Sequence, residues 1–291
     1  RGLVGSEMCI RDRLYFAGLI AGDGDLSKNR KTVTIRFSNS SKDLIQSFRN
    51  LSKRLFGAKP SISSKGSHKR SESWRFNSKL VFEILESLGL SISPKSHRID
   101  ISNILLELPN NLLASYLRGY FDTDGGCVKT ERGGYIESNS TSKAFSEKLN
   151  LVLLRYGIIA KIRERKVRSN EKICSKHNRF SVSIVGKENL KQFRKFIGFN
   201  QNEKKQKLNK ILNEISKANT NIDVIPDVRK LIKEIQKDLK IGKLLKRKDK
   251  HGISRNYLLK KIMPNLTALK HKNVRILKKL ANSDILWDTV V

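Results

Sequence analysis

The sequence predicts an α+β protein built from two tandem copies of one domain, arranged about a pseudo-twofold axis and followed by a small helical C-terminal domain. Two observations lead to this fold class. Short motifs of the first half return in the same order about 100 residues later. Within each half, apolar residues recur at helical spacing in some segments and alternate with polar residues in others, which predicts helix, hairpin, helix, hairpin, helix.

We expect the first copy at residues 14–108, the second at 109–212 and a basic helical domain at 213–282. Residues 1–13 are unlike the rest of the chain and resemble a translated sequencing-adapter remnant. We therefore expect this N-terminal segment to be artefactual and exclude it from the prediction of the fold.

Four motifs carry the duplication. The first pair comprises residues 16–24 and 117–125, which place Asp23 and Asp124 101 positions apart. The other pairs are 37–40 with 137–140, 55–57 with 155–157, and 88–90 with 197–199. Their offsets are 100, 100 and 109, so we expect about nine extra residues in the second copy, between Arg163 and Asn178. Four motifs in one order at nearly one spacing indicate a duplicated domain.

Alternating apolar and polar residues predict strands at 33–38, 158–163 and 179–184. The polar face of these strands is rich in basic and hydroxyl residues and poor in acids. Solvated faces usually mix charges of both signs, so we interpret this face as one that meets DNA, with an ordinary solvated face as the alternative. The DNA-binding residues that we expect are Arg36, Ser38, Arg75, Lys161, Arg163 and Arg179.

Helical spacing predicts helices at 41–56, 79–88, 142–156 and 187–197. Ser41 and Ser142 are the expected N-caps, because serine oxygens accept hydrogen bonds from the first helical N–H groups. Glycines stand where helices commonly end, and they are Gly57, Gly89, Gly157 and Gly198.

Asp23 and Asp124 each end a predicted helix, the second of which begins at 108–111. Small residues four apart, at Gly18 and Gly22 in one helix and at Gly119 and Thr123 in the other, form the expected helix interface, because they let two backbones approach closely.

If those helices pack together, the two aspartates meet at the negative ends of both helix dipoles. That arrangement is unfavourable without a divalent cation, and Mg²⁺ prefers a few carboxylate oxygens completed by water and phosphate. Metal-clamped hydrolysis of phosphodiesters uses such a cluster. Either motif alone reads more simply as a turn, but two copies in register within a duplicated basic chain favour the metal site.

Both motifs resemble the LAGLIDADG signature of homing endonucleases, and the resemblance covers roughly residues 14–212. It implies an αββαββ repeat and a saddle of two four-stranded sheets over the DNA major groove. It also implies a monomer with internal pseudo-twofold symmetry that cuts both strands at a long asymmetric target site and leaves short 3′ overhangs. The implied cofactor is Mg²⁺, with Mn²⁺ as a substitute.

Residue by residue, the resemblance makes Asp23 and Asp124 the catalytic metal ligands, with Gly22 and Thr123 beside them in the metal set. It makes Lys95 and Lys204 the catalytic lysines that polarise the hydrolytic water or stabilise charge near the scissile phosphates. Two lysines among many is the plainer interpretation of that pair.

Two positions depart from the family pattern. Ala21 replaces an acid that the second copy keeps as Asp122, at a mostly structural position, so we expect little loss of function. Arg118 replaces a small residue, so we expect different packing on that side. Asp25 and Asp122 are second-rank site candidates.

Charge points to a polyanionic partner. Sixty Lys and Arg against 27 Asp and Glu leave a formal net charge of +33, so nucleic acid is the expected partner and salt should weaken binding steeply. A ribosomal or chromatin protein could share this charge, although those proteins often carry it in tails. Three cysteines are too few and too irregular for a disulfide framework, and Cys174 with His177 is an isolated pair. Without an apolar run of membrane-spanning length or a signal peptide, we expect a soluble cytoplasmic protein that does not contact membranes.

The last third lies outside the duplication. Segments 227–239, 241–248 and 256–263 have helical spacing, and residues 229–261 hold thirteen Lys and Arg against three acids. We therefore expect an additional DNA contact there. Residues 252–257 resemble the turn and second helix of a helix-turn-helix, and an ordinary basic helical bundle is the equal alternative.

Residues 280–291 and 221–226 resemble the segment that joins the endonuclease to the C-terminal splicing block of archaeal-type inteins. This likeness implies that residues 283–291 begin a truncated splicing segment, that the nuclease is the homing part of an archaeal intein, and that an interrupted host protein is its parent. The chain lacks both a nucleophile at the intein's first position and a terminal His-Asn, so we expect no splicing. The alternatives are a free-standing intron-encoded endonuclease, an RNA maturase and a non-cleaving DNA-binding regulator.

Overall fold

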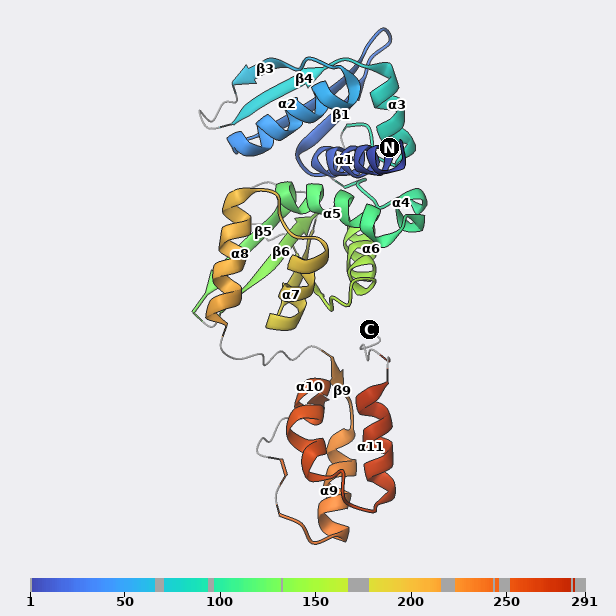
Figure 1. Cartoon of the computed structure of the whole chain (residues 1–291), viewed down its shortest axis with the longest axis vertical. Helices are drawn as coiled ribbons and strands as arrows, with labels where there is room; N and C mark the ends of the chain where they lie inside the picture. The colour runs from blue at the N-terminus through green and yellow to red at the C-terminus, as the bar shows by residue number, and fades with distance from the viewer. Residues whose placement is uncertain are drawn as a thin grey trace. The chain divides into compact units, whose positions relative to one another are not determined.

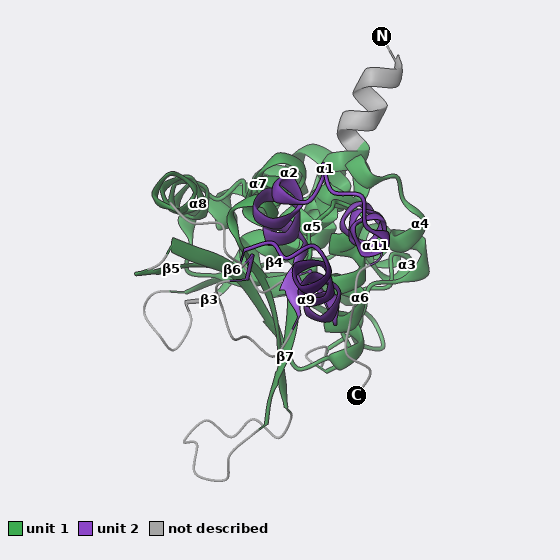
Figure 2. Cartoon of the chain, turned by 90° about the horizontal axis from the view of Figure 1, so that it is seen from below, with its two compact units in different colours: residues 1–218 green, residues 219–291 purple. Residues whose placement is uncertain are grey.

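The structure, a computed structural model, describes residues 2–65, 71–93, 97–131, 133–166, 178–215, 223–242, 244–245, 252–283 and 285, with residues 2–9 and 64–65 as backbone alone. The chain forms two compact units, Arg1–Ala218 (unit 1) and Asn219–Val291 (unit 2), which Figure 2 colours green and purple. Each unit has its own hydrophobic core.

Unit 1 contains two repeats of the predicted α+β pattern. The elements of the first repeat are α1 (Gly2–Asp23), β1 (Gly24–Lys28), β2 (Val33–Asn39), α2 (Lys42–Phe56), β3 (Ser61–Lys65), β4 (Glu72–Phe76), α3 (Lys79–Ser87) and α4 (Asn103–Glu107). Those of the second repeat are α5 (Asn110–Asp124), β5 (Gly125–Thr130), β6 (Gly133–Ser140), α6 (Lys143–Leu154), β7 (Lys161–Arg165), β8 (Arg179–Val185), α7 (Lys187–Phe196) and α8 (Asn202–Glu214). The predicted αββαββ repeat is confirmed.

The two sheets share one topology. Their strand orders are β1-β2-β4-β3 and β5-β6-β8-β7, and every neighbouring pair is antiparallel. Helices α2 and α3 pack on the first sheet, and α6, α7 and α8 on the second (Figure 1). Buried strand residues such as Ile35, Phe37, Ile136 and Ile184 point toward these helices. The opposite face of each sheet carries the polar residues of the alternating pattern.

Strand pairing corrects one predicted correspondence. Gly24 lies opposite Phe37, and Gly125 lies opposite Ser138, so the equivalent strand positions are 101 apart rather than 100. The repeated Ser-Asn-Ser letters at 38–40 and 138–140 are therefore one residue out of structural register. Because a one-residue shift reverses the face of a strand, Ser38 is exposed whereas Ser138 is buried at 2% exposure.

The extra residues of the second repeat enter mainly at the β7–β8 connection. Ser61 and Lys161 hold equivalent places on β3 and β7, 100 positions apart, whereas Phe76 and Ile184 on β4 and β8 are 108 apart. This agrees with the predicted insertion between Arg163 and Asn178, most of which lies outside the described residues. One predicted boundary was wrong: residues 158–160 precede β7, because Ile158 turns into the core instead of continuing the strand.

The helix ends follow the predicted signals. Gly57, Gly89, Gly157 and Gly198 all adopt positive φ, the conformation that ends many helices. Ser142 caps α6 by accepting a hydrogen bond from the Phe145 N–H at 3.2 Å. Ser41 occupies the N-cap of α2, but its side chain makes no capping hydrogen bond. Its own N–H instead donates to Asn39 Oδ1 at 2.6 Å.

Unit 2 is a small helical body with a short two-stranded sheet. Its elements are β9 (Val224–Ile225), α9 (Val228–Asp238), β10 (Ile253–Ser254), α10 (Arg255–Tyr257), η1 (Leu258–Ile262), η2 (Met263–Asn265) and α11 (Lys272–Asn282). The last two residues that the structure describes here, Ser283 and Ile285, follow α11. Segments 221–222 and 286–291 of the intein-like stretches lie outside the described residues.

One helix prediction for unit 2 was wrong. The predicted helix at 241–248 is not helical at residues 241, 242, 244 and 245, because α9 ends at a positive φ on Lys240 and Gly242 follows. The apolar spacing there instead places Leu245 in the core. At the segment for which a helix-turn-helix and an ordinary helical bundle were equal alternatives, residues 253–254 form β10 against β9. The helical spacing at 256–263 is confirmed, because α10, η1 and the start of η2 cover it.

Candidate active site

Helices α1 and α5 cross at the centre of unit 1 in very close contact (Figure 1). A Cβ atom built on Gly18 would lie 2.0 Å from the Tyr116 carbonyl oxygen, and one on Gly119 would lie 2.2 Å from that of Tyr15. Each glycine therefore meets the tyrosine of the other helix, and the two tyrosines occupy equivalent positions 101 apart. This reciprocal contact is what a pseudo-twofold axis requires, and the structure brings the predicted interface glycines together.

The same crossing brings the C-terminal ends of the two helices together. A Cβ atom on Gly22 would lie 1.9 Å from Thr123 Oγ1 and 3.5 Å from the carboxyl carbon of Asp124. Asp124 thus stands beside the residue that precedes Asp23. Asp124 is exposed and Asp23 is half-buried, so both carboxylates are accessible at the surface on which the helices end.

Asp23 is held by the first sheet. Asn39, the last residue of β2, donates from Nδ2 to the Asp23 carboxylate and accepts the Ser41 N–H on its Oδ1. One asparagine therefore ties the end of α1 to the start of α2. The sequence prediction missed Asn39, although it falls inside a motif that the duplication singled out.

Lys204 reaches the end of α5 from the first turn of α8. Its Nζ donates to the carbonyl oxygens of Phe121, Asp122 and Thr123 at 3.2, 2.6 and 3.1 Å. Burial lowers the pKa of Lys204, while the charges of Asp122, Asp23 and Asp124 oppose that shift. The ammonium group neutralises the negative end of the α5 dipole, so it offsets part of the repulsion between the two aspartates.

Asp122 lies behind the site and is fully buried. Its carboxylate accepts hydrogen bonds from the Tyr15 hydroxyl at 2.8 Å and from the Asn200 and Gln201 N–H groups at 3.1 Å. Burial raises the pKa of Asp122, and these hydrogen bonds oppose the shift. Asp122 joins α1, α5 and the start of α8, so it supports the site rather than facing a ligand.

The remaining predicted residues fall in three places. Asp25 lies on β1 with its carboxylate 3.9 Å from the Arg36 guanidinium. Arg118 donates from Nε to the Ile197 carbonyl oxygen and so ties α5 to the end of α7. Lys95 lies outside the described residues, as do Cys174 and His177.

The oxygen ligands at the helix junction fit a hard divalent cation whose remaining coordination positions are filled by water and phosphate. Within the described residues, no group of three His, Cys, Asp or Glu side chains gathers closely enough to hold a metal. Thr123 Oγ1 donates to the Tyr120 carbonyl oxygen at 2.8 Å, so its hydroxyl belongs to the helix. The available ligands are two carboxylates and helix-end carbonyls, all oxygens, which suits Mg²⁺ if water and phosphate supply the other positions.

The predicted DNA-binding residues lie on the sheet faces opposite the helices. Arg36 pairs with Arg75 across β2 and β4, and Ser38 stands two residues along the same strand. In the second sheet, Lys161 and Arg163 alternate on β7. Arg179 is paired with Arg165 in the same register and shares their face.

Ser38 and Glu137 are held by neighbours on these faces. Ser38 donates from Oγ to Ser73 Oγ at 2.8 Å. Glu137 accepts hydrogen bonds from Ser181 and Ser183. These hydrogen bonds fix the positions of the two side chains on the polar faces of the sheets.

Comparison with known families supports the duplication. A family model described as a LAGLIDADG-like domain matches residues 11–89 and, a second time, residues 111–198. Together the two matches cover more than half of the chain.

Three curated relatives match 75–94% of the chain, but the chain spans a quarter or less of each of them. It is 33% identical over 283 residues to the replication factor C small subunit of Methanocaldococcus jannaschii, covering 94% of this chain and 14% of that protein. It is 29% identical over 277 residues to the glutamine–fructose-6-phosphate aminotransferase of the same organism, covering 94% and 24%. A probable translation initiation factor from that organism is 34% identical over 221 residues, covering 75% and 17%.

Solved structures match about two thirds of the chain at low identity. The homing endonuclease I-DmoI, in complex with DNA and Mn, has a TM-score of 0.49 and 17% identity, covering 65% of this chain and 97% of that one. The homing endonuclease I-WcaI, bound to its DNA recognition sequence, has a TM-score of 0.48 and 17% identity, covering 68% and 86%.

No helix within the described residues is both long and apolar enough to cross a membrane.

Proposed function

This chain belongs to the LAGLIDADG-like family, and on that premise we propose that it is a sequence-specific endonuclease that makes Mg²⁺-dependent double-strand breaks in DNA. The observation that carries the proposal is the meeting of Asp23 and Asp124 at the crossing of α1 and α5. Two carboxylates at two negative helix ends repel each other, so their meeting there costs stability when no cation is bound. A shared divalent cation offsets that repulsion and can at the same time bind a phosphate oxygen of the DNA.

In this proposal, Asp23 and Asp124 hold the metal, with the backbone at Gly22 and Thr123 beside them. Mg²⁺, or Mn²⁺ in its place, supplies charge stabilisation and an activated water when it is bound with DNA. Lys204 keeps a positive charge beside both carboxylates and fixes the end of α5. Lys95, which lies outside the described residues, is the proposed catalytic lysine of the first repeat by its position in the sequence alone.

The polar sheet faces are the proposed DNA surface. Antiparallel ribbons fit the major groove, where base edges are distinguishable. Arg36, Arg75, Lys161, Arg163 and Arg179 supply phosphate or guanine contacts, and hydroxyl groups such as that of Ser38 add adaptable ones. Because one chain supplies both halves, a monomer can read a long asymmetric site.

Unit 2 adds phosphate contacts in this proposal. Each of its described acids has a partner inside the unit: Asp223 with Arg255, Asp227 with Lys230, Glu234 with Asn273, and Asp238 with His271. The exposed side of α11, by contrast, carries Lys272, Arg275, Lys278 and Lys279. Replacing Arg275 and Lys279 with glutamine should lower the salt slope of DNA binding by about 2, and an unchanged slope would remove α11 from the interface.

We also propose that the chain is the nuclease part of an inserted element of intein type, with an archaeal host protein as its parent. Three proteins with unlike names each share this segment over 14–24% of their length. Insertion of one mobile element into several hosts produces such a distribution. Sequencing the flanking DNA tests this: flanks that join into one host protein, with splicing blocks between, support the intein, whereas intron boundaries contradict it.

The nuclease proposal is tested by replacing each aspartate. The target is first recovered from a plasmid library of candidate insertion sites incubated with the wild-type protein and Mg²⁺. Asp23→Asn and Asp124→Asn should each lower the cleavage of both strands by about 1,000-fold or more, because the metal clamp loses a ligand. Binding of the target should persist. Asp43→Asn, at an exposed position on α2, is the matched control and should cut normally.

The outcomes separate the candidate functions. Tight binding of duplex DNA without any break, in Mg²⁺ or Mn²⁺, would indicate the non-cleaving regulator. Preference for a structured RNA over duplex DNA would indicate the maturase. A normal cutting rate in either aspartate variant would contradict the assignment of the metal ligands.

A further inference from the structure

The two halves of the proposed nuclease differ at one buried position. Asp122 of the second repeat corresponds to Ala21 of the first, 101 positions earlier, and both are fully or almost fully buried, at 0% and 3% exposure. Their neighbours are equivalent as well: Tyr15 contacts Asp122, and the tyrosine that corresponds to Tyr15 is Tyr116. The pair therefore allows a direct comparison of one site with and without the carboxylate.

In the second repeat, the Asp122 carboxylate fixes the segment that leads into α8 and so positions Lys204. Asp122 accepts the N–H groups of Asn200 and Gln201, and Gln201 is the N-cap of α8. Lys204 stands in the first turn of that helix and binds back to three carbonyls at the end of α5. Asp124 follows directly in the chain. A closed set of contacts thus sets the position of Lys204 relative to Asp124.

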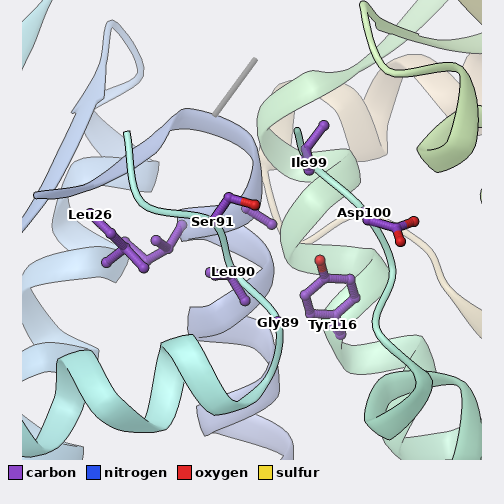
Figure 3. Close-up of a pocket in the computed structure, with 9 residues that line it drawn as sticks. Leu26, Gly89, Leu90, Ser91, Ile99, Asp100 and Tyr116 are labelled. Carbon is purple, nitrogen blue, oxygen red and sulfur yellow. The ribbon is translucent and has the colours of Figure 1, made fainter. Parts of the chain in front are cut away.

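In the first repeat, a cavity occupies the place of that carboxylate. It measures ≈ 10 Å³ and is lined by Ala21, Leu90, Ser91 and Tyr116 among others (Figure 3). Leu90 and Ser91 correspond to Phe199 and Asn200, the latter of which is bound by Asp122. A volume of this size holds about one water molecule, so the missing carboxylate has not been replaced by protein atoms.

Within the described residues, Tyr116, the tyrosine beside this cavity, lacks a carboxylate partner such as Asp122 provides for Tyr15. Tyr116 is 1% exposed, and none of the hydrogen bonds found in the described part of the chain involves its hydroxyl. Asp100 lies near it and, after burial, is the second cause that raises the pKa of Tyr116. The Asp100 carboxylate, however, is bound by Lys148 and by the Ile101 N–H. The carboxylate that joins Tyr15, Asn200 and Gln201 in the second repeat therefore has no equivalent at position 21 of the first.

From this difference we infer that the enzyme cuts its two DNA strands in a fixed order, the strand served by Lys204 and Asp124 before the strand served by the first repeat. The inference rests on the proposed nuclease function. Each cut is a separate hydrolysis in which a water oxygen bonds to phosphorus, one ester bond breaks, and the leaving oxygen takes a proton. Because small displacements of positioning groups cost large factors in rate, the repeat without the carboxylate falls behind and a nicked duplex accumulates.

Asp122 is a positioning residue in this scheme, and the test compares strands within one reaction. A duplex of the recovered target, labelled differently on its two strands, is cut in a single turnover with Mg²⁺. Lys204→Met identifies the strand that depends on Lys204, because that strand should slow more. In the wild-type protein this strand should be cut about tenfold faster than the other, the factor expected from one supporting network of hydrogen bonds.

Two variants should narrow the ratio of the two cutting rates, one by slowing the faster strand and the other by accelerating the slower strand. Asp122→Ala should slow the faster strand and bring the two rates within about twofold of each other. Ala21→Asp should accelerate the slower strand, since its carboxylate can bind the Tyr116 hydroxyl and the backbone at Ser91. If Ala21→Asp does not fold, Tyr15→Phe provides the second arm. Loss of the Tyr15 contact loosens Asp122 and should narrow the ratio while the melting temperature stays above that of the assay.

Amide hydrogen exchange of the free protein gives a readout that needs no DNA. The Asn200 and Gln201 amides should exchange more slowly than those of Ser91 and Ile92, and Asp122→Ala should remove the difference. Equal rates for both strands in the wild-type protein would overturn the inference while leaving the nuclease intact, and so would a ratio that Asp122→Ala leaves unchanged. If no duplex is cut at all, the nuclease proposal itself fails and the strand order falls with it, whatever the exchange rates.

Discussion

The two repeats of unit 1 share a backbone but not the side chains that support it. In the second repeat, the side chains of Asp122 and Arg118 bind backbone groups of the segment 197–201 that leads from α7 into α8. At the equivalent positions of α1, the first repeat has Ala21 and Ala17. The close approach of the helices is nevertheless reciprocal, because it depends on Gly18 and Gly119 alone. The two repeats are thus symmetric where the backbones of α1 and α5 touch, and they differ in the side chains at positions 17 and 118 and at positions 21 and 122.

The sheet faces have diverged in the same way. Strand register makes Arg36 equivalent to Glu137, Arg75 to Ser183 and Ser61 to Lys161. In the first sheet, these paired residues place positive charge on the inner strands β2 and β4. In the second sheet, the equivalent positions place it on the outer strand β7. Two halves with different charge patterns cannot favour the same half-site, so the comparison favours an asymmetric target.

The helix crossing offers the largest effect and tests whether the symmetry is real. Gly18→Ala and Gly119→Ala should each lower the free energy of unfolding by about 3 kcal/mol, because the new methyl group overlaps a backbone carbonyl that cannot move away cheaply. Denaturant melting measures it. Gly126→Ala is the matched control, since its Cβ atom would meet its nearest neighbour at 3.7 Å.

A large loss in one glycine variant and none in the other would break the pseudo-twofold contact. It would mean that one helix can shift to make room while the other cannot. Similar losses in both would confirm that the reciprocal contact is the constraint that the duplication has retained.

The tyrosine pair gives the next largest effect. Tyr15→Phe should lower the free energy of unfolding by about 2 kcal/mol, because it leaves a buried carboxylate without one donor. Tyr116→Phe should change it by less than about 0.5 kcal/mol, since no described partner is lost. Thermal melting of both variants at one pH decides the matter. Equal losses would show that the Tyr116 hydroxyl has a partner of similar strength and that the cavity is filled.

A smaller effect follows from the raised pKa of Asp122. Burial keeps this carboxyl protonated to higher pH in the folded chain than in the unfolded chain, whose pKa is near 3.8. As the pH rises from that value through the folded pKa, ionisation of the buried group costs stability, by roughly 1.4 kcal/mol per unit of pKa difference. Asp122→Asn cannot ionise.

The measurement is therefore a difference between two proteins. The free energy of unfolding of the wild type, minus that of Asp122→Asn, should fall as the pH rises from about 4 toward neutrality. A difference that rises instead would mean that the hydrogen bonds from Tyr15, Asn200 and Gln201 outweigh burial. The wild type should in that case be most stable with Asp122 charged.

The duplication, the strands and the helix ends were predictable because each leaves a local pattern in the sequence. The reason for the failure at 241–248 is equally local: apolar spacing reports burial, and residues such as Leu245 are buried without being helical. The Ser-Asn-Ser match failed because identical letters do not fix strand register, which pairing alone determines.

The aspartates were predictable from their repetition, whereas their supports were not. Tyr15 stands 101 residues before Tyr116, one position ahead of the repeated motif, so the signal existed but carried no indication of its partner. The bonds from Asp122 to Asn200 and Gln201 span almost 80 residues. Only the packing of α8 on β5, β6 and α7 brings its first turn to the end of α5, and no spacing rule predicts it.

The smallest effects concern the sheet faces, and they sharpen the comparison between the two halves. Arg75→Ala and Arg163→Ala should each reduce the salt slope of binding to a random-sequence duplex by about 1, since each removes one phosphate contact. Glu137→Gln, at the position equivalent to Arg36, should strengthen that binding at low salt because it removes a negative charge from the second face. Arg36→Gln should weaken it. Fluorescence titrations across salt concentrations measure all four variants, and Lys79→Ala on α3, behind the first sheet, is the control. If Glu137→Gln and Arg36→Gln shift the affinity in the same direction, the two positions do not face the DNA in equivalent ways, and the proposed use of both sheets as one surface is wrong.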